Sequence, residues 1–118
     1  MKRKFNILVN AENMVEYVYD VTDKCPKKIR LDMVTSLRRC ANDFLENVIR
    51  ANKEALGSSK RAEYQNECLT LLTLIDEFSL ICMKRCYITM HQLDVLGTHT
   101  SGLYESIENW NASDVRRK

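Results

Sequence analysis

Residues that interrupt helices are scarce in this chain. Its 118 residues contain three glycines and one proline, a composition that favours long helices joined by few connections. Apolar residues recur at steps of three and four over most of the length, which is the period of one face of an α-helix. The sequence therefore predicts an all-α fold.

The periodicity predicts four helices, over residues 6–24, 27–56, 60–85 and 89–111. Pro26 separates the first two, and Gly57 suits a left-handed cap after the second. Thr89 and Gln92 have the spacing of a capping box at the start of the last helix, in which Gly97 would allow a close helix approach. Because short connections join antiparallel neighbours, we expect one domain over residues 1–118, an antiparallel up-down-up-down four-helix bundle with frayed basic tails.

Composition agrees with a globular protein. Hydrophobic residues make up 45% of the chain and charged residues 29%, enough apolar material for one core. The longest apolar stretch, residues 68–83, contains Asp76 and Glu77 and is therefore not an ordinary membrane span. The basic start Met1-Lys2-Arg3-Lys4 is not followed by the apolar segment of a signal peptide. We expect a cytoplasmic protein with no membrane partner.

Five cysteines, an odd number with no CxxC pair, predict free thiols rather than a disulfide framework. Cys82 and Cys86 are four residues apart and could supply half of a metal site, but no second pair of ligands is evident. The sequence also lacks HExxH, P-loop, GxGxxG and Glu-x-x-His motifs. His91 and His99 are expected to be ordinary surface or boundary residues. The prediction is a protein without catalytic residues, metal or cofactor.

The third predicted helix is apolar on more than one face, and such a helix is buried on more than one side. We expect its additional apolar residues to contact another subunit of a homo-oligomer. Tyr17 and Tyr19 cannot both face the core, so one of them is expected at the same interface; tyrosines of this kind could alternatively stack on bases. The predicted interface comprises Tyr17, Tyr19, Leu69, Leu74, Leu80 and Ile81.

Basic residues gather at one end of the predicted bundle. An up-down topology brings together the starts of helices one and three and the ends of helices two and four. Such a cluster can bind nucleic-acid phosphates, or it can complement helix dipoles and remain solvated. Ten of the 18 basic residues form this candidate nucleic-acid site: Lys2, Arg3, Lys4, Arg50, Lys53, Lys60, Arg61, Arg116, Arg117 and Lys118.

Two segments carry a resemblance to a known family. Residues 11–52 read AENMVEYVYDVTDKCPKKIRLDMVTSLRRCANDFLENVIRAN, and residues 87–110 read YITMHQLDVLGTHTSGLYESIENW. These segments resemble the bacterial and phage four-helix-bundle proteins that include the accessory variability determinant (Avd) of diversity-generating retroelements. The similar features are the tyrosine-rich end of the first helix, Pro26 with Lys27, the stretch from Glu46 to Asn52, and a last helix that ends in Trp110.

The resemblance implies a function that the residues alone do not. Avd proteins are homopentameric rings that associate with the element's reverse transcriptase, bind RNA or DNA through a basic surface and support mutagenic retrohoming. A sister branch is encoded within rRNA intervening sequences. Residues 42–48, NDFLENV, depart from that branch's small-residue, proline-containing segment, whereas Cys25 departs from the bulky apolar residue of relatives. The alternative function is a structural or protein-interaction bundle without a nucleic-acid role.

Overall fold

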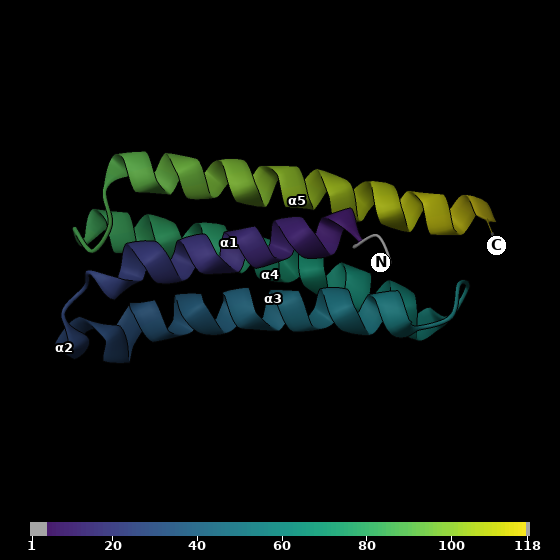
Figure 1. The fold of residues 1–118 in the computed structure, drawn as a ribbon, viewed down its shortest axis with the longest axis horizontal. Coiled ribbons are helices and arrows are strands. Elements are labelled where there is room, and N and C mark those ends of the chain that lie inside the picture. The colour runs from purple at the N-terminus through teal and green to yellow at the C-terminus, as the bar shows by residue number, and fades with distance from the viewer. Residues whose placement is uncertain (1–4, 118) are drawn as a thin grey trace.

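Four long helices of alternating direction form the molecule (Figure 1). The computed structural model describes residues 5–117. Within this range, residues 29–31 are described by their backbone alone. The helices are α1 (Asn6–Asp23), α3 (Thr35–Lys53), α4 (Ser59–Lys84) and α5 (Met90–Arg117). Each packs beside the next one along the chain, and α5 also packs beside α1, which closes the bundle. The predicted all-α, antiparallel four-helix bundle is confirmed.

One apolar stripe from each helix faces a common core. The stripes follow the three- and four-residue steps seen in the sequence, and Phe44 is the largest of the fully buried side chains. Burying a side chain of this size stabilises the fold by roughly 1.5–3 kcal/mol. Members of the core are Ile7, Ala11, Met14 and Val18 of α1, Leu37, Ala41, Phe44 and Val48 of α3, Cys68, Leu72 and Ile75 of α4, and Leu96, Leu103 and Ile107 of α5.

The predicted second helix, over residues 27–56, is wrong as one continuous element. The structure divides its first part into a short α2 (Lys27–Ile29) and the π-helical segment η1 (Arg30–Val34). Inside this segment Asp32 has a non-helical backbone, with φ −118° and ψ −122°. The sequence contains no proline or glycine there to mark a break, although aspartate is a poor helix former. At the other end, α3 stops at Lys53 and Glu54 is extended.

Local signals set the remaining connections. Gly57 has φ 87°, a left-handed conformation that glycine adopts without steric cost, and the Ser58 side chain then accepts a hydrogen bond from the Lys60 amide. At the α4–α5 turn, the Thr89 and Gln92 side chains each accept a hydrogen bond from the other residue's backbone amide, at 3.0 and 2.8 Å. The predicted capping box is confirmed.

Helix α5 continues to Arg117, six residues beyond the predicted end at residue 111. The expectation of a frayed basic tail beyond this helix is therefore wrong for residues 112–117, while residues 1–4 and 118 lie outside the described part of the chain. A buried carboxylate, Asp114, anchors these last turns to α4. The close helix approach expected at Gly97 is not present within this chain. A Cβ atom built at Gly97 meets no other atom within 4 Å.

Arg38 joins α3 to the end of α1. Its Nε donates to the Thr22 hydroxyl at 2.8 Å, its Nη2 pairs with Asp23 at 2.9 Å, and its guanidinium lies over the Tyr19 ring. The buried Thr22 hydroxyl in turn donates to the Val18 carbonyl oxygen at 2.7 Å. A buried hydroxyl without a partner is costly, so this arrangement fixes how α1 and α3 meet.

Candidate nucleic-acid interface

The predicted basic cluster lies at the end of the bundle where α1 and α4 begin and α3 and α5 end (Figure 1). Five of its described members are exposed: Arg50 and Lys53 on α3, Lys60 on α4, and Arg116 and Arg117 on α5. These five residues are called the basic end below. Lys2, Arg3, Lys4 and Lys118 belong to the same prediction but lie outside the described residues.

Helix geometry explains the charge at this end. Arg50 and Lys53 lie in the last turn of α3, and Arg116 and Arg117 lie in the last turn of α5, where positive side chains offset the partial negative charge of the helix terminus. The starts of α1 and α4 add their own partial positive charge, which attracts anions. The basic end therefore gathers positive charge from three helices at one end of the bundle.

Arg50 has an acidic neighbour on its own helix. Its guanidinium pairs with the Glu46 carboxylate at 2.6 Å, and both side chains are 54% exposed. The hydrogen bond to Glu46, followed by the charge of that carboxylate, raises the pKa of Arg50. Because exposed pairs are stabilised only weakly, the contact with Glu46 leaves this guanidinium accessible to another anion at little cost.

Arg61 was predicted as a nucleic-acid contact, and the structure places it inside the molecule instead. Its Nε and Nη2 donate to the two oxygens of Asp114 at 2.6 and 3.0 Å, and its Nη1 donates to the Glu54 carbonyl oxygen at 3.1 Å. Its guanidinium also lies 5.1 Å from the centre of the Trp110 ring. The Arg61 side chain is only 14% exposed, so its charge is used to hold α4 and α5 together.

The Arg61–Asp114 pair is part of a larger buried network. Gln65 donates to Asp114 at 2.8 Å and accepts a hydrogen bond from Asn111 at 2.7 Å. Burial raises the pKa of the Asp114 carboxyl, but the hydrogen bonds from Arg61 and Gln65, with the positive charges of Arg61 and Arg117, outweigh burial and hold that pKa below its usual range. The sequence places Asp114 at this end of the bundle, because the antiparallel order sets the end of α5 opposite the start of α4, but its pairing with Arg61 was not predicted.

The residues predicted to contact another subunit fall into two groups. Tyr17 packs against His99 with ring centres 5.4 Å apart, Tyr19 accepts a hydrogen bond from Asn42, and Leu69 packs against the core. Leu80 is half-buried between α4 and α5. Leu74 and Ile81 are exposed by 37% and 36% and lie seven residues apart, on one face of α4.

The half metal site considered for Cys82 and Cys86 does not form. Cys82 is buried in α4, whereas Cys86 is exposed beyond the helix end, with φ 63°. None of the five cysteines forms a disulfide, and all except Cys86 are buried. Among residues 5–117, no three histidine, cysteine, aspartate or glutamate side chains gather closely enough to hold a metal ion.

Neither a protein-family model nor a curated protein matches this sequence. Within the part of the chain that the structure describes, no helix has both the length and the apolar character required to cross a membrane.

Proposed function

We propose that this protein is a non-enzymatic, cytoplasmic accessory protein of a diversity-generating retroelement. In this proposal it binds RNA or DNA and the element's reverse transcriptase as a homopentamer, and so supports mutagenic retrohoming. The observation that carries the proposal is the basic end, where three helices bring five exposed cations to one end of the bundle. The resemblance of residues 11–52 and 87–110 to Avd proteins supplies the particular partner.

Basic residues lie almost entirely at the two ends of the bundle, and at the end opposite the basic end Asp20, Asp23, Asp32 and Asp94 offset them. Apart from Arg38 and Arg39, the middle turns of the four long helices, residues 6–23, 35–49, 62–83 and 90–115, contain no lysine or arginine. Cations that neutralise phosphates release condensed counterions, so the affinity falls steeply with salt. A ring of subunits would repeat the basic end around one face and strengthen weak contacts through multivalency.

Reversing two charges of the basic end tests nucleic-acid binding. In the variant Lys53→Glu with Lys60→Glu, we expect affinity for a structured RNA to fall by about tenfold or more, and the slope of log K against log salt to decrease by about two. Fluorescence anisotropy at about 50 and about 200 mM salt measures both quantities. Arg61 is left unchanged because its loss would disturb folding.

The matched control reverses two exposed lysines at the opposite end of the bundle, Lys24→Glu with Lys84→Glu. This control has the same net charge and is expected to bind RNA more tightly than the basic-end variant. Equal affinity of the two variants would remove the basic end from the proposal. If the wild-type protein fails to bind RNA at the lower salt, the alternative of a protein-interaction bundle replaces the nucleic-acid role.

The proposed homo-oligomer has its own test on the exposed face of α4. Leu74→Glu places a charge on the exposed face that Leu74 shares with Ile81, and we expect the mass measured by light scattering to fall toward the 13.8 kDa of one chain. Burying an unpaired charge in an apolar interface costs several kcal/mol, enough to dissociate it. The control is Thr73→Glu, at an exposed polar neighbour. An unchanged mass for Leu74→Glu would exclude this face as the subunit contact.

A further inference from the structure

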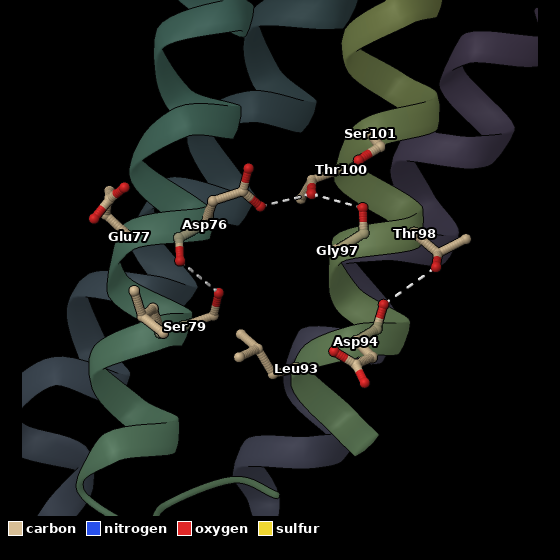
Figure 2. Close-up of a pocket in the computed structure, with 10 residues that line it drawn as sticks. Asp76, Glu77, Ser79, Leu93, Asp94, Gly97, Thr98, Thr100 and Ser101 are labelled. Carbon is tan, nitrogen blue, oxygen red and sulfur yellow. Dashed lines mark hydrogen bonds between the residues drawn. The ribbon is translucent and has the colours of Figure 1, made fainter. Parts of the chain in front are cut away.

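An acidic hollow lies between α4 and α5, away from the basic end. Its volume is about 620 Å³, and its lining includes Leu80 of α4 with Leu93 and Gly97 of α5. Asp76, Glu77 and Asp94 supply three carboxylates, and none of its lining residues is basic. Figure 2 shows Asp76 between the two helices, Glu77 on the side of α4 away from α5, and Asp94 on α5 near Leu93. We call this feature the α4–α5 groove.

The polar groups inside the groove are satisfied within the chain. The buried Thr100 hydroxyl lies 2.6 Å from Asp76 Oδ1 and 3.1 Å from the Gly97 carbonyl oxygen (Figure 2). The buried Ser79 hydroxyl donates to the Asp76 carbonyl oxygen at 3.0 Å. In contrast, the exposed carboxylates of Glu77 and Asp94 form no ion pair with a described basic side chain. The negative charge at the edges of the groove is therefore available to a partner.

We infer that the α4–α5 groove is the docking site for a lysine- or arginine-bearing helix of a partner protein. The groove runs between two antiparallel helices, so a third helix can lay apolar side chains on Leu80 and Leu93 while its cations meet Glu77 and Asp94. Gly97 has no side chain and nothing within 4 Å of its Cβ position, which lets a partner backbone come close.

Charge selects this occupant over the other candidates. Nucleic acid would be repelled by the three carboxylates. A second copy of the chain is a poor match, because the middle turns of its long helices contain no basic residue other than Arg38 and Arg39, and Arg38 is already paired with Asp23. A different protein with a cationic helix is the complementary partner. The inference deepens the proposed function, on which it rests for a protein partner separate from the nucleic acid.

A labelled peptide of about 20 residues, long enough to form a helix, serves as the probe. It carries leucines on one face and lysines beside them, and a second peptide has glutamates in place of the lysines. We expect the lysine peptide alone to bind the wild-type protein in fluorescence anisotropy. Nuclear magnetic resonance shift changes should centre on Leu80, Leu93, Gly97 and Thr98, the groove residues.

Two pairs of variants localise the binding. Glu77→Lys with Asp94→Lys is expected to weaken affinity for the lysine peptide at least about tenfold. The control, Glu16→Lys with Asp20→Lys, makes the same charge change on α1 and is expected to keep a higher affinity for that peptide. Gly97→Phe fills the groove and should abolish binding, while Gly102→Phe should not, since a Cβ atom meets nothing within 4 Å at either glycine. Circular dichroism confirms that each variant is folded.

The outcomes separate this inference from the proposed function. Failure of the wild type to bind the lysine peptide, or equal binding by the groove and control variants, would overturn the docking site. The proposed RNA contact would stand in that case if the Lys53→Glu, Lys60→Glu variant still loses RNA affinity. Conversely, groove-dependent peptide binding with no effect of the basic end on RNA would sustain the docking site and reject the nucleic-acid role.

Discussion

Replacing Asp114 with alanine is expected to lower the free energy of unfolding by about 3 kcal/mol. The change removes the acceptor of two hydrogen bonds from Arg61 and one from Gln65. It also leaves the Arg61 guanidinium charged and largely buried without its partner, because the side chains of this pair are 14% and 10% exposed. Urea unfolding followed by circular dichroism at pH 7 measures the loss.

Glu46→Ala is the matched control, since Glu46 also pairs with an arginine at 2.6 Å, but at a site where both side chains are 54% exposed. We expect this control to cost less than about 0.5 kcal/mol. Similar losses of unfolding free energy in the two variants would show that burial of the Arg61–Asp114 pair adds nothing to stability. A double variant, Arg61→Met with Asp114→Leu, should cost less than the sum of the single changes, because it leaves no unpaired charge.

The same pair gives stability a defined dependence on acid. Since the pKa of Asp114 is lower in the folded protein, the stabilisation is present above the unfolded value of 3.8 and is lost as the pH falls through the folded value. The difference in free energy of unfolding between wild type and Asp114→Ala is therefore expected to become smaller when unfolding is measured below pH 3.8. A constant difference would contradict the lowered pKa.

At alkaline pH the largest expected effect comes from buried thiols. Burial, followed by the charge of Glu67, raises the pKa of Cys68 from 9.0 to about 12. Burial likewise raises the pKa of Cys82 from 9.0 to about 11, with smaller contributions from Cys25 and Asp32. Between pH 9.0 and these raised pKa values, both thiols stay neutral in the folded protein but ionise in the unfolded chain. Their stabilisation is complete below pH 9.0 and declines as the pH rises toward the folded values.

Comparison of wild type with Cys68→Ala isolates one thiol. We expect the wild type to lose about 1.4 kcal/mol more per pH unit than the variant as the pH rises above 9. Cys86→Ala removes an exposed thiol and is expected to follow the wild type. Urea unfolding at a series of pH values measures the free energy of unfolding as a function of pH. Parallel pH dependences for Cys68→Ala and wild type would reject a raised pKa for the buried thiol.

Local patterns in the sequence were sufficient to predict the helices and several of their ends. The three- and four-residue spacing around Phe44 identifies the buried face of α3 because that spacing matches the helical period. Thr89 and Gln92 identify the start of α5 because a capping box acts within one turn. Such signals depend on neighbours in the chain, so they can be recognised without a structure.

The candidate sites were predicted only in part. The basic end follows from topology, because alternating helix directions decide which charged termini meet. The same reasoning counted Arg61 among the surface cations, since side-chain type does not reveal a partner 53 residues away. The apolar surface of α4 was likewise predicted as one interface, whereas Leu80 lines the α4–α5 groove and Leu74 is exposed.

The sequence by itself determined that this protein forms a bundle of long helices, because few breakers and a continuous helical period leave little else for its apolar residues to do. Only the tertiary structure decided where the second predicted helix breaks at Asp32, which arginine is buried, and where the last helix ends. The burial of Arg61 and the end of the last helix depend on groups that are distant in sequence and meet only when the helices pack. The Arg61–Asp114 pair spans 53 residues, and burial gives this pair a stabilisation that no local pattern specifies.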